Sequence, residues 1–202
     1  MKHLKFFGDS INMRHIEDAV RILRDGGVII YPTDTMYALG CDALNNRAIE
    51  RLCRLKGINP DKHLLSIVCG SMSQASEYAR IDNKAFRLMK DYLPGPFTFI
   101  LPSSSSLPKV FKGRKSVGVR IPDCEIAVEL ADALGNPILS TSVAPDDADD
   151  ALSPEALALA YHHDADLLID GGEGRLDVST IVDCLDSSAP EIVRQGVGEI
   201  SL

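Results

Sequence analysis

Residues 28–40 read VIIYPTDTMYALG and join an apolar run to a polar loop. The run 28–31 is apolar and β-rich, so it predicts a buried strand. Loops at strand ends line the ligand crevice of open α/β sheets, and this loop carries the hydroxyls of Thr33 and Thr35 and the carboxylate of Asp34. The stretch therefore predicts a ligand-binding loop. The alternative is a turn whose polar side chains satisfy their own backbone.

Helices and strands alternate on both sides of this junction. Before it, apolar residues recur at the helical spacing of three and four, and the glycines at 26 and 27 end that helix. After it, the pattern predicts helices over 46–55, 83–92, 125–134 and 154–162, and strands over 64–69, 97–101, 117–121, 138–142, 166–169, 180–184 and 192–194. The alternation predicts an α/β fold, with helices packed against a central sheet.

The composition is that of a globular protein with one sizeable core: 202 residues, 45% hydrophobic and 25% charged. No internal repeat or change of composition marks a boundary, so residues 1–202 are expected to form a single domain. No apolar run approaches the roughly 20 residues that cross a bilayer, and the start lacks a secretory signal, which predicts a cytoplasmic protein without a membrane partner. Five scattered cysteines without a C-x-x-C pair favour reduced core residues.

The net charge of -8 opposes indiscriminate binding to nucleic acid, because such binding depends on cations that neutralise phosphates. A local basic face could still bind RNA. Its sources would be two groups of cations, Lys109, Lys112, Arg114 and Lys115 on the one hand and Arg51, Arg54, Lys56 and Lys62 on the other. The alternative is that both groups are solvated surface.

Further hydroxyls stand at the ends of predicted strands. Ser140 and Ser142 end one strand, and Ser179 opens another. Each hydroxyl offers a donor and an acceptor, which suits recognition of a small polar ligand. The sequence has no phosphate loop, dinucleotide fingerprint or nucleophile elbow, and no H-x-x-x-H pair, so no metal site is predicted.

Two arginines, Arg120 and Arg194, lie in apolar surroundings, in VGVRIP and IVRQG. A wholly solvated guanidinium is disfavoured there, so each predicts a carboxylate or phosphate ligand. An internal ion pair to an aspartate is the alternative for both. His63, in the loop after the second predicted helix, is a further candidate for ligand contact.

Seven segments occur in the order found in the YrdC/YciO family: PTDTMYALG, the lysine at a helix end, PGPFTFIL, SVGVRIP, PILSTS, VSTIVD and IVRQGVG. From Gly26 to Gly198 the chain resembles that family. The resemblance implies a YrdC-like fold, in which a twisted mixed parallel and antiparallel sheet with flanking helices surrounds a central cavity. It also implies threonylcarbamoyl-AMP synthase-like activity, which joins L-threonine, bicarbonate and ATP, releases diphosphate and feeds the modification of adenosine in tRNA. ATP is then a substrate, and Mg²⁺ is expected with it.

The resemblance also implies the roles of particular residues. Lys56, at the phosphates, and Arg120 would be catalytic. The nucleotide would contact Ser116, Ser142 and Arg194. L-threonine would contact Thr35, Arg120, Ser140 and Ser179.

Two departures from the synthase motifs point to the YciO branch. The synthases carry K-x-R, but Lys56 is followed by Gly57 and Ile58, so the second cation is missing. They also read S-x-N, where this chain has SVA at 142–144. Two alternatives to a synthase therefore stay open: a YciO-type protein that binds double-stranded RNA, or an AMP/ATP-binding protein without turnover. The acidic run 146–150 is expected to be a solvated loop.

Overall fold

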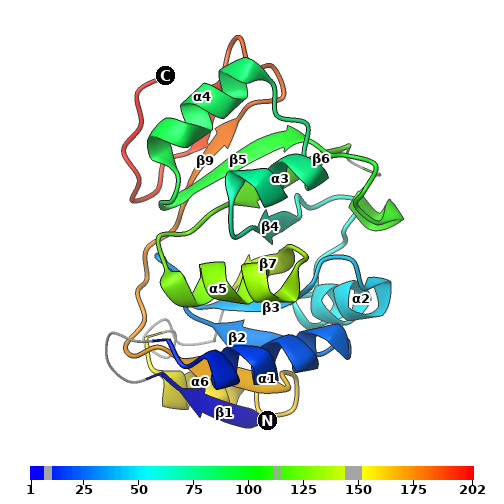
Figure 1. The fold of residues 1–202 in the computed structure, drawn as a ribbon, viewed down its shortest axis with the longest axis vertical. Coiled ribbons are helices and arrows are strands. Elements are labelled where there is room, and N and C mark those ends of the chain that lie inside the picture. The colour runs from blue at the N-terminus through cyan, green and yellow to red at the C-terminus, as the bar shows by residue number, and fades with distance from the viewer. Residues whose placement is uncertain (7–10, 112, 114, 144–151) are drawn as a thin grey trace.

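The computed structural model describes residues 1–6, 11–111, 113, 115–143 and 152–202. A ten-stranded sheet extends through these parts of the chain, with β1 at one edge and β10, next to β9, at the other (Figure 1). The strands are β1 (Lys2–Lys5), β2 (Ile29–Tyr31), β3 (Ala38–Asp42), β4 (Ser66–Val68), β5 (Phe97–Pro102), β6 (Ser116–Arg120), β7 (Ile138–Ser142), β8 (Leu167–Asp170), β9 (Thr180–Asp183) and β10 (Glu191–Arg194).

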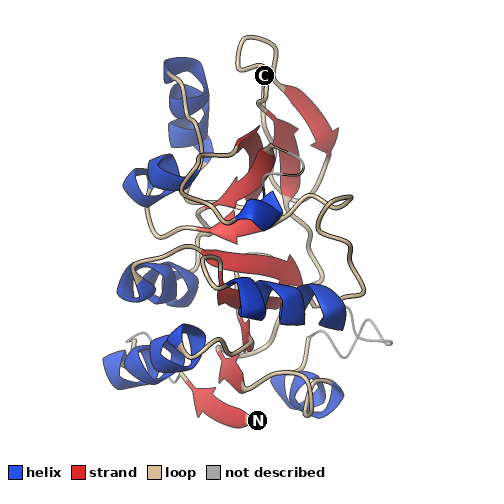
Figure 2. Cartoon of the chain, turned by 90° about the vertical axis from the view of Figure 1, so that its right-hand side faces the viewer, coloured by secondary structure: helices blue, strands red, loops and turns tan. Residues whose placement is uncertain are grey.

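Helices lie on both sides of this sheet (Figure 2). They are α1 (Met13–Arg24), α2 (Asn46–Leu55), α3 (Met72–Tyr78), α4 (Asn83–Tyr92), α5 (Glu125–Leu134) and α6 (Pro154–Ala160), with a 3-10 turn at Lys109–Phe111. Five of them begin at a side chain that accepts a hydrogen bond from the first turn, namely Asn12, Asn45, Ser71, Asp82 and Ser153. Such caps satisfy backbone donors that have no partner within the helix.

The sheet mixes parallel and antiparallel pairs in the order β1-β8-β2-β3-β7-β4-β6-β5-β9-β10. β1 and β2 run parallel to β8, β4 runs parallel to β6, and β5 runs parallel to β9. The remaining neighbours are antiparallel. The predicted mixed α/β sheet is therefore confirmed. This order also brings strands that are distant along the chain together in the middle of the molecule.

Two clusters of buried apolar side chains hold the helices against the sheet. One joins α1 and α5 to the β2–β8 half, through side chains such as Leu23 and Leu130. The larger one includes Leu52 of α2, Met89 of α4 and Phe99 of β5, all fully buried. Burying one such side chain contributes about 1.5–3 kcal/mol. The ends of the strands are therefore held in place by a well-packed hydrophobic core.

The sequence pattern gave the bounds of α2, α4, α5 and β7 correctly but missed β1, β3 and α3. β1 buries only Leu4, and α3 buries only Ala75 and Tyr78, so neither has a clear apolar period. β3 occupies the second half of the predicted loop. Its Gly40 is a poor strand former, although the whole strand is buried.

All five cysteines are free, and Cys124 alone among them is not fully buried, in agreement with the expected core role. In the part of the chain that the structure describes, no helix is long and apolar enough to cross a membrane.

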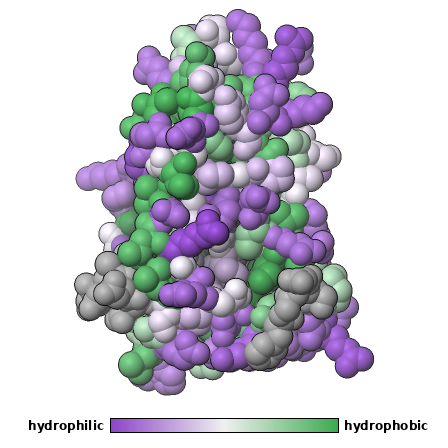
Figure 3. All heavy atoms as spheres, turned by 90° about the vertical axis from the view of Figure 1, so that its left-hand side faces the viewer, coloured by the Kyte–Doolittle hydropathy of each residue, from purple (hydrophilic) through white to green (hydrophobic). Residues whose placement is uncertain are grey.

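The connection from β8 to β9 runs along the left edge of Figure 1, on a face where hydrophilic groups surround scattered apolar ones (Figure 3). The acidic run 146–150 lies outside the described residues.

Candidate ligand-binding site

A central cavity opens where β4 and β7 part. The two strands pair as far as Ser66 and Ser140, and the residues just beyond this pair, before β4 and at the end of β7, border the cavity. Its volume is about 150 Å³, the space of about five water molecules. This is below the ~300 Å³ at which pockets for drug-sized ligands begin. The enclosed space therefore fits a small molecule.

Arg120, the last residue of β6, is 8% exposed and reaches the loop of residues 32–37. Its Nη2 donates to Asp34 Oδ1 at 2.7 Å and to Thr35 Oγ1 at 3.2 Å. Its Nε is buried and has no partner among the described residues. A buried donor without a partner costs about 1–3 kcal/mol. The ion pair that the sequence left open is thus present, and it uses only part of the guanidinium.

Arg194 faces the same cavity from the end of β10. Its Nη2 donates to the Ser179 carbonyl at 2.8 Å and to Ser179 Oγ at 3.2 Å. Ser179 Oγ lies 2.9 Å from Thr98 Oγ1 on β5. Burial lowers the pKa of Arg194, and the positive charge of Arg120 lowers it further. Arg194 is exposed, and no carboxylate in the described ranges forms an ion pair with it.

Lys56 approaches the site at the C-terminal end of α2. Its Nζ donates to the carbonyl oxygen of Ser142 at 2.9 Å, and Ser142 lines the cavity. Burial lowers the pKa of Lys56 from its ordinary value. Lys56, which the motifs place at the phosphates, therefore lies directly beside Ser142, one of the predicted nucleotide contacts.

Part of the lining is apolar. It includes Leu52, Ile58, Leu64, Leu65 and Leu139. Ile58 follows Lys56 by two positions, where the synthase motif has an arginine. The cavity therefore offers both apolar side chains and hydroxyl and guanidinium groups.

Five of the eight residues named from the motifs line this one cavity: Arg120, Ser140, Ser142, Ser179 and Arg194. Thr35 contacts it through Arg120, and Lys56 through Ser142. Ser116 is buried at the first position of β6 and does not belong to the lining. Of the second departure from the synthase motifs, Ala144 lies outside the described residues.

Sequence reasoning missed two hydroxyl groups that contact serines of the cavity lining. Thr98 was read only as part of the strand in PGPFTFIL, although its hydroxyl meets Ser179. Tyr31 was read as the end of a buried strand, yet its hydroxyl donates to Ser140 Oγ at 2.7 Å. A polar atom inside an otherwise apolar strand is the signal that could have drawn attention to both.

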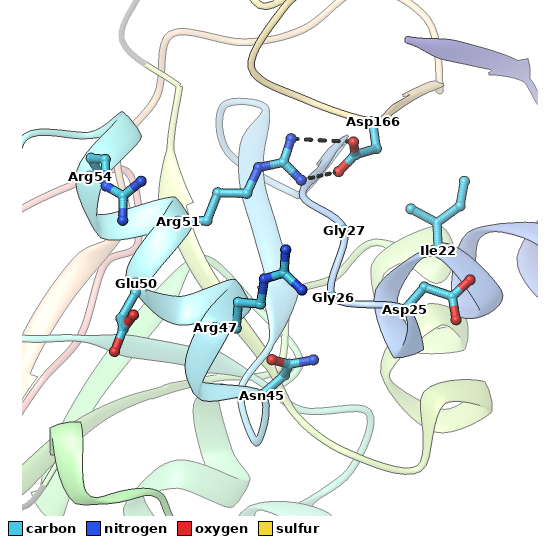
Figure 4. A pocket seen from close by; sticks show the side chains of 10 residues that line it. All are labelled: Ile22, Asp25, Gly26, Gly27, Asn45, Arg47, Glu50, Arg51, Arg54 and Asp166. Atoms are coloured by element: carbon cyan, nitrogen blue, oxygen red, sulfur yellow. Dashed lines mark hydrogen bonds and ion pairs between the residues drawn. The ribbon is translucent and has the colours of Figure 1, made fainter.

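A larger hollow of about 610 Å³ lies elsewhere, between α2 and the turn that follows α1 (Figure 4). Arg47 and Arg51 extend from α2 toward Gly26 and Gly27, while Glu50 points away from them. Arg51 pairs with Asp166, and three arginines are balanced by three carboxylates in the lining. None of the predicted site residues lies here, so size alone does not identify the candidate site.

The second group of cations proposed for RNA is divided between two places in the structure. Arg51 is paired with Asp166 and Arg54 lines the larger hollow, whereas Lys56 lies beside the central cavity. In the first group, Lys112 and Arg114 lie outside the described residues. RNA binding stays a prediction.

The histidine and acidic side chains of the described chain add no further site. His63 Nδ1 lies 3.0 Å from the carbonyl oxygen of Asn59, and His63 does not line the cavity. Within the described ranges, no three His, Cys, Asp or Glu side chains gather into a metal site. The Asp34 carboxylate is occupied by Arg120 and by the backbone N–H of Asp123. Asp34 is therefore not available as a ligand for a divalent cation.

The chain was compared with known proteins. The Sua5/YciO/YrdC family model, described as "Telomere recombination", matches residues 21–196. YciO of Escherichia coli is 41% identical over 195 residues, which are 95% of this chain and 94% of that protein. The threonylcarbamoyl-AMP synthase of Pyrococcus abyssi is 33% identical over 183 residues, which are 90% of this chain and 54% of that protein.

Solved structures give the same picture. The crystal structure of E. coli YciO matches with a TM-score of 0.90 at 39% identity, covering 98% of both chains. The structure of P. abyssi Sua5 complexed with L-threonine matches with a TM-score of 0.83 at 32% identity, covering 96% of this chain and 57% of the other. The YrdC-like fold expected from the motifs is therefore confirmed.

Proposed function

Because the chain belongs to the Sua5/YciO/YrdC family, we propose that it is a threonylcarbamoyl-AMP synthase-like enzyme. It would join L-threonine, bicarbonate and ATP into threonylcarbamoyl-AMP, release diphosphate and supply the modification of adenosine in tRNA. One observation carries the proposal. Within the described residues, Arg120 presents a buried donor without a partner at a cavity where the second guanidinium, Arg194, has no carboxylate partner. Such a pair suits a ligand rich in acceptor oxygens.

In this proposal the substrates divide the site between them. The threonine carboxylate would take the free side of the Arg120 fork, beside Thr35, Ser140 and Ser179. The enclosed volume suits one small acid, so the nucleotide would extend past Ser142 toward Lys56 and Arg194. Ser116 has the weakest support, because its side chain stands outside the lining.

The chemistry would depend on placement and charge. Attack on the α-phosphate leaves diphosphate and needs positive charge around the phosphoryl oxygens, which Lys56 and Arg194 would supply. Mg²⁺ would be held by oxygens of ATP, in keeping with its habit of binding substrate phosphates. No side-chain nucleophile is required, since holding the reactants together can lower the barrier by several kcal/mol.

A second function is favoured by one observation. Ile58 puts an apolar side chain into the lining where the synthase motif has a cation. Loss of a phosphate contact would reduce the stabilisation of the transition state more than it would reduce the affinity for the nucleotide. The protein would then bind AMP or ATP without turnover.

Diphosphate release from ATP tests the proposal. Release should require both L-threonine and bicarbonate, and it should fall at least about tenfold in Arg120→Lys, which keeps the charge but loses the planar fork. Release that ignores threonine, or that is unchanged in Arg120→Lys, would overturn the proposal. Nucleotide binding without release would favour the second function.

A further inference from the structure

Tyr31 connects the buried sheet to the central cavity. It ends β2, is fully buried, and its hydroxyl donates to Ser140 Oγ on β7 at 2.7 Å. β3 lies between these two strands. The tyrosine ring therefore has to pass β3 to reach the serine.

Gly40 leaves the space for this passage. In the sheet it pairs with Ser140 on one side, and a Cβ atom at Gly40 would lie only 2.7 Å from Tyr31 Cε1. Real Cβ atoms essentially never come that close. The glycine, which is unfavourable in a strand, is thus explained by the ring that crosses it.

The contact gives the Ser140 hydroxyl the role of acceptor toward Tyr31. A serine hydroxyl has one proton and two acceptor positions, and Tyr31 occupies one of the acceptor positions. Burial raises the pKa of Tyr31, so the phenol keeps its proton. Among the residues that the structure describes, nothing accepts the proton of Ser140, and Ser140 lines the cavity. That proton is free for a ligand.

We propose that Tyr31 is a positioning residue that, through the gap at Gly40, holds Ser140 as a hydrogen-bond donor to an acceptor oxygen of the bound acid. The inference rests on the proposed function for the identity of that acid. The contact makes this point of the cavity favour an oxygen acceptor over an N–H donor, because Tyr31 takes one of the two acceptor positions of Ser140 and leaves its proton for a ligand.

L-threonine titrations with a double-mutant cycle test the inference. Tyr31→Phe keeps the ring and removes the donor, so affinity should fall about three- to tenfold. Ser140→Ala should cost at least as much, and the double variant should bind no more weakly than Ser140→Ala alone. The matched control is Tyr78→Phe, since Tyr78 is also buried and its hydroxyl makes no hydrogen bond within the described chain.

Two results would contradict the inference: an affinity of Tyr31→Phe equal to that of Tyr78→Phe, or losses that add in the double variant. Thermal unfolding of all variants tests the alternative that the contact only stabilises the fold. Loss of a purely structural contact would lower Tm without changing the affinity. A variant that fails to fold is replaced by Tyr31→Met, for which the same loss of affinity is expected.

A measurement without ligand separates this inference from the proposed function. In the proton NMR spectrum of the free protein, the Tyr31 hydroxyl should give a slowly exchanging signal that is absent from Tyr31→Phe and displaced in Ser140→Ala. If wild-type protein does not bind L-threonine, the proposed function and the named acid fail together. The displaced signal would still support the positioning contact, and an unmoved signal would overturn it.

Discussion

The central cavity and the larger hollow beside α2 are both lined by arginines, but they differ in how their charges are compensated. In the hollow, Arg51 is paired with Asp166, and carboxylates equal arginines in number. In the cavity, Asp34 meets one side of Arg120, while Arg120 Nε and the charge of Arg194 have no acidic partner in the part of the chain that the structure describes. Uncompensated donors, more than volume, indicate where a ligand is needed.

The largest expected effect comes from changing one arginine in each place. Arg120→Lys should weaken L-threonine binding about 10- to 100-fold, because a lysine cannot make the forked, charge-assisted contact. Arg51→Lys is the matched control and should leave the affinity unchanged. Isothermal titration of both variants measures the difference. Equal losses in the two would remove the distinction between cavity and hollow.

Arg194 gives the next effect, on the nucleotide. Arg194→Gln removes the charge and should weaken ATP binding about tenfold, the value of one charge-assisted contact. L-threonine binding should change less, since the repulsion on Arg120 is relieved at the same time. Competition of ATP against a fluorescent nucleotide measures the loss. A stronger effect on threonine than on ATP would reverse the assignment of the two arginines.

The titration of Lys56 should make ATP binding at the central cavity depend on pH. The larger hollow beside α2 should show no such dependence. Burial lowers its pKa below the usual 10.5, so its charge is lost at a lower pH than that of an exposed lysine. ATP affinity should fall as the pH rises through the lowered pKa. Stability should rise slightly between that value and the unfolded one, because the unfolded chain binds more protons there. Lys56→Met should abolish both trends in titrations from neutral to alkaline pH.

The smallest effect is expected in the hollow itself. Arg51→Ala removes a half-exposed ion pair between α2 and the residue before β8, which should cost less than about 1 kcal/mol of unfolding free energy. Urea denaturation measures this cost. The diphosphate release of this variant should equal that of the wild type, and a loss of turnover would mean that the hollow takes part in the reaction.

The ordered motifs allowed much of this site to be foreseen. Arg120, Ser140, Ser142, Ser179 and Arg194 were each placed by a short segment, and the sheet gathers them. The strands that carry them were recognisable because they are apolar runs bounded by polar residues. Each motif stands at a strand end, where α/β folds place ligands.

Contacts across the sheet could not be read from the chain. Tyr31 and Ser140 are 109 positions apart, and they meet only because β3 lies between their strands with a glycine at the crossing. β3 itself was not predicted, because that glycine is unfavourable in a strand. The pairing of Arg120 with Asp34 was open for the same reason, since it depends on the strand order and no local pattern fixes it.

The most direct test of the account is the NMR signal of the Arg120 Nε–H group, assigned by its loss in Arg120→Lys and followed during titration with L-threonine. If the central cavity binds the acid through the free donor, this signal should move and exchange more slowly as the ligand saturates. A signal that stays unchanged while threonine binds, or a protein that does not bind threonine at all, would contradict the account.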